Sequence, residues 1–142
     1  MLSALEAYSE ECKRIMTTIA SRLQAVNDRI AAAAAGAGRD PGEVALLAVG
    51  KTFPAQALAE AHAAGQKAFG ENYVQEALGK MAALSGLPLV WHHIGPIQSN
   101  KTRLVAGHFD WAHTVDRLKI AQRLSEQRPD GLAPLQVCIQ VN

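Results

Sequence analysis

The chain of 142 residues is long enough for one domain with a buried core, and its 49% hydrophobic and 19% charged residues are ordinary for a soluble globular protein. Its formal net charge is +1 and its lysines and arginines do not cluster, which argues against a nucleic-acid partner. No apolar run approaches the roughly 18 residues that span a bilayer, and the acidic N-terminus does not have the order of a signal peptide, so we expect no membrane partner.

Cysteine usage indicates a reducing compartment. Cys12 and Cys138 lack the short spacing of metal ligands. We expect both to be free thiols, and we expect the protein to be cytoplasmic.

The first long segment, Ser3 to Ala35, is predicted to form a helix because its apolar residues recur at three- and four-residue steps. The residues on this apolar face are Ile15, Ile19, Leu23, Val26 and Ile30. Gly36 and Gly38 follow, and glycine at this place commonly ends a helix.

Strands and helices then alternate. Val44 to Val49 is a continuous apolar run, typical of a strand covered on both faces, and Pro54 is suited to open the next helix. The pattern predicts further strands at Lys67 to Asn72, Pro88 to Gly95, Asp110 to Asp116 and Leu135 to Asn142. It predicts helices at Ala55 to Ala64, Val74 to Leu84, Ser99 to Gly107 and Arg117 to Gln127, with Ser99 and Asp116 as N-caps.

This repeat of strand and helix predicts an α/β fold with parallel strands and right-handed crossovers. Two architectures accommodate it, an open doubly wound sheet and part of a (β/α)8 barrel. The first turn lacks the glycine pattern of a nucleotide site, and polar residues gather at the carboxyl ends of successive strands. We therefore favour a TIM-barrel-like fold, here with about five βα units that follow an N-terminal helix.

Lys51 ends the first apolar strand. Because strand side chains alternate, Leu47, Val49 and Lys51 share one face, which points inward in a barrel. Two interpretations are open. Desolvation at a barrel mouth favours the neutral amine, which attacks aldehydes and forms a Schiff base. Alternatively, the lysine simply extends its amine to solvent.

Other polar residues lie at the same predicted rim. Asn72 faces the mouth or caps the next helix, while Glu71 points away and is interpreted as a surface charge. His92 and His93 are predicted to lie on opposite faces of their strand. A zinc site would need a third ligand close by and an acid to orient it, and the spacing to His113 proves nothing, so we expect no metal.

Five blocks of the sequence closely resemble the pyridoxal phosphate homeostasis protein family, whose members are small relatives of the alanine racemase barrel domain. They read LLAVGKTFP, FGENYVQEAL, WHHIGPIQSNKTRLVA, HTVDRL and CIQVN, in this order and at the family's spacings. The resemblance implies a (β/α)8-type barrel that holds pyridoxal 5′-phosphate (PLP) at its mouth. It implies that Lys51 carries PLP as a Schiff base, the internal aldimine.

The resemblance further implies that Asn72 and His92 line the mouth, together with Val49 on the strand face of Lys51. The implied role is PLP homeostasis and delivery without established catalytic turnover, by a monomer whose partners include PLP-dependent apo-enzymes. Two alternatives stay open: an alanine-racemase-like enzyme that acts on amino acids, and a fragment that binds nothing.

Three departures from the family pattern stand out. Gly50 stands where the family usually has serine or threonine, and His93 stands where it usually has phenylalanine. The family's chains normally continue beyond Asn142, and the residues expected to hold the phosphate lie in that continuation. Residues 1–142 are thus interpreted as a single, partial PLP-binding barrel domain, with residues 1–15 as an extension outside the resemblance.

Overall fold

The structure, a computed structural model, describes the backbone of residues 4–141 and the side chains of residues 18–141. It divides the chain into two units, one of Met1–Leu46 with Gln56–Gln66 and one of Leu47–Ala55 with Lys67–Asn142. None of the helices in the described range combines the length and the apolar character needed to cross a membrane.

The first unit contains α1 (Ala4–Gly36), a 3-10 helix at Pro41–Glu43, and α2 (Ala55–Ala63). The long predicted helix is confirmed to within one residue at each end. Gly38 follows it with a φ of 66°, a left-handed conformation that glycine adopts without strain. Of the predicted apolar face, Ile19, Leu23 and Ile30 are half-buried, and Val26 is exposed. Ile15 lies outside the described side chains.

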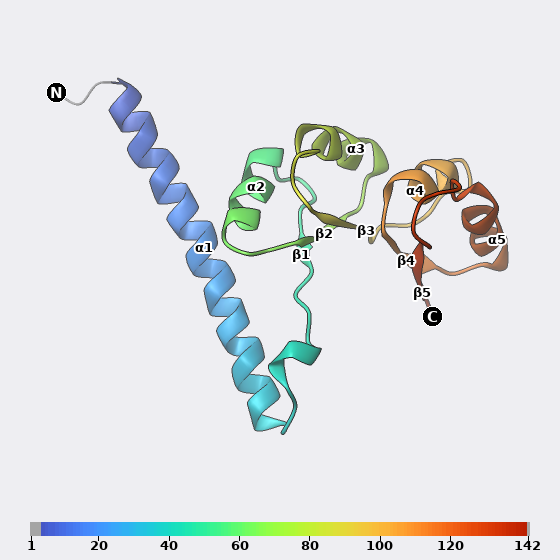
Figure 1. Cartoon of the computed structure of the whole chain (residues 1–142), viewed down its shortest axis with the longest axis horizontal. Coiled ribbons are helices and arrows are strands. Elements are labelled where there is room, and N and C mark those ends of the chain that lie inside the picture. The colour runs from blue at the N-terminus through green and yellow to red at the C-terminus, as the bar shows by residue number, and fades with distance from the viewer. Residues whose placement is uncertain (1–3, 142) are drawn as a thin grey trace. The chain divides into compact units, whose positions relative to one another are not determined.

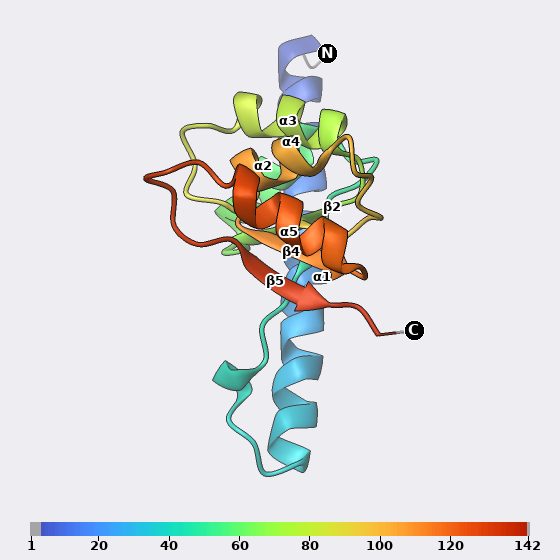
Figure 2. The ribbon, with the colours of Figure 1, turned by 90° about the vertical axis from the view of Figure 1, so that its right-hand side faces the viewer.

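The second unit is a sheet of five parallel strands in the order β1 to β5. The strands are β1 (Ala48–Val49), β2 (Ala68–Glu71), β3 (Val90–His93), β4 (Trp111–Val115) and β5 (Gln136–Ile139). The helices are α3 (Val74–Ala83), α4 (Thr102–His108) and α5 (Leu118–Gln127), which lie on the same side of the strands (Figures 1 and 2). Sequential order with crossovers of one hand produces this arrangement and confirms the predicted βα repeat.

The two faces of the sheet differ in burial. The face toward the helices carries side chains that are almost fully buried, among them Phe69, Glu71, His93 and Ala112. On the opposite face, Val49, Gly70, His92 and Trp111 are in register on neighbouring strands. Val49 is 47% exposed there, and His92 and Trp111 are half-buried. We call this second face the open face.

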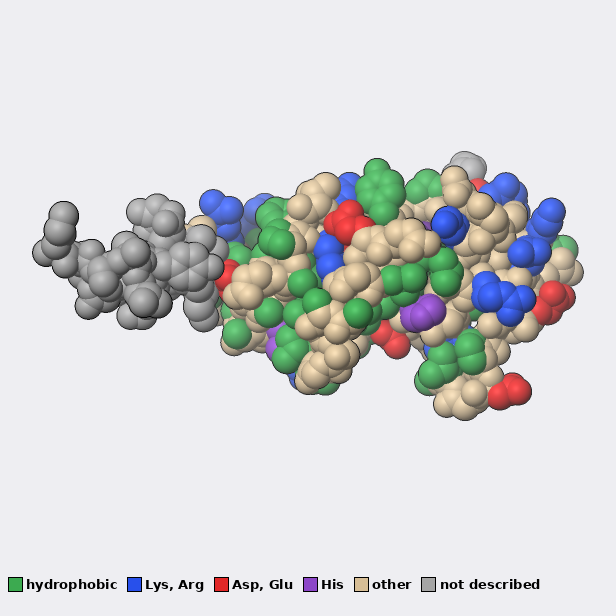
Figure 3. All heavy atoms as spheres, turned by 90° about the horizontal axis from the view of Figure 1, so that it is seen from above, with side chains coloured by type: hydrophobic (Ala, Val, Ile, Leu, Met, Phe, Trp, Pro, Cys, Tyr) green, Lys and Arg blue, Asp and Glu red, His purple; other side chains and the backbone are tan. Residues whose placement is uncertain are grey.

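Acidic and basic side chains are interspersed on the face of the molecule displayed in Figure 3. This mixture agrees with the near-neutral formal net charge of +1.

Several local predictions are wrong. The strand predicted at Val44 to Val49 is only Ala48–Val49, because Val44 ends the 3-10 helix and β1 pairs with β2 alone. The predicted cover on both faces also fails for Val49, since it points to the open face.

Neither predicted N-cap is found. Helix α4 begins at Thr102, whose hydroxyl donates to the carbonyl of Ser99. Helix α5 begins after Arg117, and the Asp116 carboxylate pairs with the Arg117 guanidinium instead of capping the helix.

Gly95 is predicted to be intolerant of a side chain. A Cβ atom at this position would lie 2.9 Å from the Cα of Asn72 and closer still to its carbonyl oxygen. We expect Gly95→Ala to lower the free energy of unfolding by about 1–3 kcal/mol, because backbone must move to admit the methyl group. Urea unfolding measures this change.

Gly107→Ala is the matched control, because Gly107 lies inside α4 and a Cβ there meets no atom within 4 Å. This substitution should stabilise the protein by about 0.5–1 kcal/mol, the usual gain from alanine in a helix. Equal effects of the two substitutions would contradict the close approach at Gly95.

Candidate functional site

Lys51 follows β1 at the carboxyl edge of the sheet, and its side chain is exposed. It is the second residue of a tight turn in which the Phe53 N–H donates to the Gly50 carbonyl over 3.0 Å. The third residue, Thr52, has a φ of 67°. This combination matches a type II turn, whose third residue is usually glycine.

Thr52 is therefore in a conformation that costs about 1–2 kcal/mol for an L-residue and more for a β-branched one. It is the sole non-glycine residue with positive φ that the structure records in the described range. Its N–H donates to Glu76 Oε1 over 3.0 Å. A strained turn that persists needs such outside support.

A buried ionic network lies next to this turn. The Lys80 side chain is 7% exposed, and its Nζ donates to both carboxylate oxygens of Glu71 over 2.9 and 3.1 Å. The same Nζ donates to Glu76 Oε1 over 2.6 Å and to the Gly50 carbonyl over 2.7 Å. We call Glu71, Glu76 and Lys80 the clamp network.

Lys80 stabilises the negative charges of both carboxylates, and they stabilise its positive charge, whereas the charge of Glu76 disfavours that of Glu71. Burial raises the pKa of Glu71, and the hydrogen bond and charge of Lys80 oppose that rise. The hydrogen bond from Lys80 is the main reason why the pKa of Glu76 is lowered. Burial acts to lower the pKa of Lys80, but the hydrogen bonds and charges of Glu76 and Glu71 outweigh it and raise the pKa. Lys80 is therefore a permanent cation at neutral pH.

Glu71 points away from the open face, as predicted, but its interpretation as a surface charge is wrong. It is fully buried and paired with Lys80. Neither Lys80 nor Glu76 was singled out from the sequence. The available signal was their four-residue spacing, which places a glutamate and a lysine side by side on one helix.

His92 lies on the open face in an aromatic cluster. Its ring stacks on Trp111 with centroids 5.3 Å apart and an interplanar angle of 6°. Its Nδ1 lies 2.9 Å from Nε2 of His113. Burial, with the like charge of His113, lowers the pKa of His92 to about 4, although Asp110 acts in the opposite direction. His92 is therefore an uncharged hydrogen-bonding ring at neutral pH.

His93 points to the opposite face, which confirms the prediction for this pair. It is 1% exposed and meets Phe109 edge to face, with centroids 5.2 Å apart. Burial lowers its pKa, and the backbone of Pro96 acts against that shift. Neither ring nitrogen has a hydrogen-bond partner among the described residues. The His93 ring, which stands where the family usually has phenylalanine, is thus neutral and directed away from the open face.

Asn72 follows β2 and is half-buried at the same edge of the sheet as Lys51. Together with His93 and Lys101 it lines a pocket of about 390 Å³. The four residues predicted for the cofactor therefore all lie at the carboxyl ends of β1, β2 and β3. Val49 and His92 are in one register row, separated by Gly70, which carries no side chain between them.

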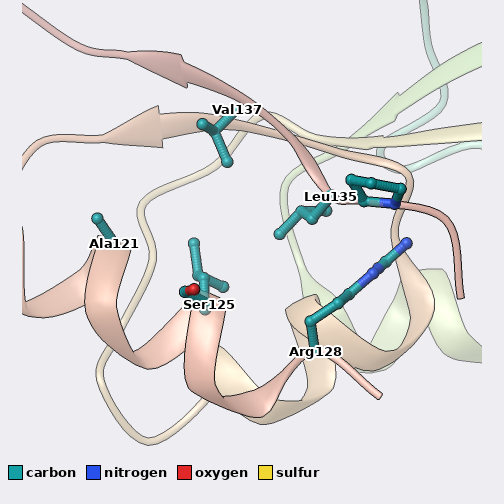
Figure 4. Close-up of a pocket in the computed structure, with 7 residues that line it drawn as sticks. Ala121, Ser125, Arg128, Leu135 and Val137 are labelled. Atoms are coloured by element: carbon teal, nitrogen blue, oxygen red, sulfur yellow. The ribbon is translucent and has the colours of Figure 1, made fainter. Parts of the chain in front are cut away.

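A second pocket, of about 410 Å³, lies between α5 and β5 and away from this edge (Figure 4). Apolar side chains such as Leu124, Leu135 and Val137 line it, with Arg128 at one side. The Arg128 guanidinium donates to the carbonyls of Ala106, Phe109 and Ala133, so its charge is engaged in holding loops. The chemistry of this pocket is apolar packing.

Residues 21–142 match the family described as "Alanine racemase, N-terminal domain". The chain belongs to this family. With the parallel five-stranded sheet, this membership confirms the predicted α/β, (β/α)8-type fold class.

Curated relatives carry the name "Pyridoxal phosphate homeostasis protein". The chain is 68% identical over 127 residues to that of Pseudomonas aeruginosa, covering 89% of this chain and 55% of the relative. It is 58% identical over 130 residues to that of Escherichia coli K12, covering 89% and 56%. The resemblance to the pyridoxal phosphate homeostasis protein family is confirmed. The chain spans a little over half the length of these relatives.

Solved structures agree with this assignment. PipY of Synechococcus elongatus, solved with PLP bound, is 46% identical and superposes with a TM-score of 0.66 over 77% of this chain and 47% of PipY. A protein of Bifidobacterium adolescentis described as unknown is 30% identical, with a TM-score of 0.69 over 89% of this chain and 52% of that protein.

The low pKa of His92 predicts a loss of stability in acid. The unfolded ring takes up a proton near pH 6.5 and the folded ring near pH 4, so the unfolded state binds more protons between these values. The free energy of unfolding should therefore fall as pH drops through this window, with about 2 kcal/mol attributable to this partly solvated ring. Urea unfolding at a series of pH values measures it.

Two variants isolate the contribution of this ring. His92→Gln should remove the share of this ring from the pH dependence and leave the share of the buried His93. His108→Gln, at an exposed histidine of α4, is the matched control. An NMR titration in which the His92 ring protonates near pH 6.5 would contradict the assigned burial.

Proposed function

We propose that this chain binds PLP at the carboxyl ends of β1, β2 and β3 and serves PLP homeostasis in the cytoplasm. The observation that carries the proposal is the likeness to PLP-bound PipY, 46% identical over 77% of this chain, together with the exposed amine of Lys51 at that edge. The names of the curated relatives support the same role. Because the chain spans about half of their length, the activity of a whole protein is part of the proposal.

Lys51 is the proposed covalent anchor. Its amine is exposed and, within the described part of the chain, forms no ion pair that would have to break first. PLP supplies an aldehyde, with which Nζ forms a C=N bond as the aldehyde oxygen leaves as water. The tight turn limits the directions in which the lysine side chain leaves the sheet.

The open face suits a flat aromatic ring. Val49 offers apolar surface, and His92 offers an uncharged imidazole stacked on Trp111. An apolar and aromatic surface with few polar groups is the usual lining of a cofactor site. Asn72 adds a neutral amide at the same edge, able both to donate and to accept hydrogen bonds.

The proposed role is that of a carrier. A site that holds an aldehyde on a lysine releases it by the reverse reaction with water or by transfer to another amine. PLP-dependent apo-enzymes carry such amines, so we propose that they are the recipients.

The decisive test is reductive labelling of the purified chain. After incubation with PLP, borohydride reduces the C=N bond to a stable pyridoxyl-lysine, which mass spectrometry locates. We expect Lys51 to carry most of the label, and the exposed Lys67 and Lys119 to carry little. Lys51→Arg keeps the positive charge but removes the nucleophile, and it should abolish the specific label.

Two other results would overturn the carrier proposal. Label scattered evenly over surface lysines would mean that this chain forms no site. The PLP-loaded protein could instead racemise amino acids and lose this activity in Lys51→Arg. That result would favour an enzyme with the racemase activity for which the family of residues 21–142 is named.

A further inference from the structure

We propose that Lys80 and Glu76 are positioning residues for Lys51, because the clamp network holds both peptide groups that flank it. This inference rests on the proposed function of Lys51 as the amine that receives PLP. It assigns a role to the buried Lys80 and the partly exposed Glu76 of α3, which do not lie on the open face.

The first held group is the Gly50–Lys51 peptide. Its carbonyl oxygen accepts from Lys80 Nζ over 2.7 Å and from the Phe53 N–H over 3.0 Å. An ammonium donor is stronger than a neutral one, so the bond from Lys80 resists competition from water. This bond fixes the direction of the peptide that precedes Lys51.

The second held group is the Lys51–Thr52 peptide. Its N–H donates to Glu76 Oε1 over 3.0 Å, and that same oxygen accepts from Lys80 Nζ over 2.6 Å. Thr52 itself stands at a φ of 67°, which a threonine does not adopt by preference. With the peptides before and after Lys51 both held, the direction in which its side chain leaves the backbone is limited.

The clamp network is itself anchored to rigid elements. Glu71 ends β2 and is fully buried, and Lys80 lies on the buried side of α3. The ion pair therefore ties a helix to the sheet beside the end of β1. Contacts that hold the backbone next to a functional residue keep its side chain in a narrow range of orientations.

Stability alone is a weak reason for such a network. Buried ion pairs are often replaced by hydrophobic residues without loss of stability, since desolvation offsets their attraction. What a hydrophobic replacement cannot do is donate to the Gly50 carbonyl and hold an acceptor for the Thr52 N–H. The structure joins these two contacts in one network, and they meet on the turn of Lys51.

The test compares Glu76→Ala with Gln75→Ala, an exposed neighbour on the same helix turn. In Glu76→Ala, hydrogen exchange of the Thr52 amide should accelerate about tenfold, as expected for loss of one hydrogen bond. Labelling of Lys51 by PLP and cyanoborohydride should slow roughly three- to tenfold relative to Lys67 and Lys119 in the same sample, because the amine is less well oriented. Gln75→Ala should change neither.

Two further variants separate positioning from folding. Glu76→Gln keeps an oxygen for the Thr52 N–H and should restore much of the labelling ratio. Lys80→Met removes the donor to the Gly50 carbonyl, and it should lower the labelling of Lys51 relative to Lys67 and Lys119 below that of Glu76→Ala. Circular dichroism and the exchange of core amides in β2 and β3 identify variants that have simply unfolded.

The outcomes are distinguishable. If Lys51 is labelled selectively in the unsubstituted chain and the ratio is unchanged in Glu76→Ala and in folded Lys80→Met, the positioning role is wrong and the proposed function stands. If Thr52 exchange accelerates without any change in the ratio, the role is likewise wrong. If the unsubstituted chain shows no preference for Lys51, the proposed function fails and this inference fails with it.

Discussion

The environment of Lys51 depends on one buried ammonium group. Lys80 Nζ is removed from water, and a cation in that position is tolerated only with anionic partners in contact. Glu71 and Glu76 supply them, and the carbonyl of Gly50 completes the set. Since Glu71 belongs to the sheet and Lys80 to α3, one interaction joins the strand, the helix and the turn.

The sheet separates charged from uncharged chemistry. On the helix side, full charges are buried but paired, as in Glu71 and Lys80. On the open face, His92 is neutral because burial disfavours its protonated form, and Val49 and Trp111 add apolar and aromatic surface. Lys51 directly follows β1, the strand of Val49, and in the proposed site its amine acts beside this uncharged surface.

Much of the fold was predictable because hydrophobic periodicity reports which side chains are buried. The order of strands and helices, their parallel direction and the place of Lys51 all followed from it. The lengths of edge strands did not, because Val49 and Ile139 are apolar yet exposed. For such residues composition alone does not distinguish a covered position from an uncovered one.

The candidate site was predictable in part for the same reason. Lys51 is conspicuous because a charge directly follows an apolar run. The clamp network is not, because Glu71, Glu76 and Lys80 look like ordinary charges of a strand and a helix until the packing of α3 on the sheet brings them together. A burial pattern does not tell which charged residue will find a partner inside, since that depends on the register of the two elements.

Thr52 shows why a clamp and a flexible turn are not equivalent. A glycine at this position would adopt a φ of 67° without strain, but it would also populate many other conformations. A threonine prefers the extended and right-handed helical regions, so Thr52 keeps this φ because the bond to Glu76 and the bond from Lys80 to Gly50 offset the strain. The turn is thereby confined to one geometry by contacts from outside it. In the proposed role, the exposed Lys51 presents its amine from this confined turn.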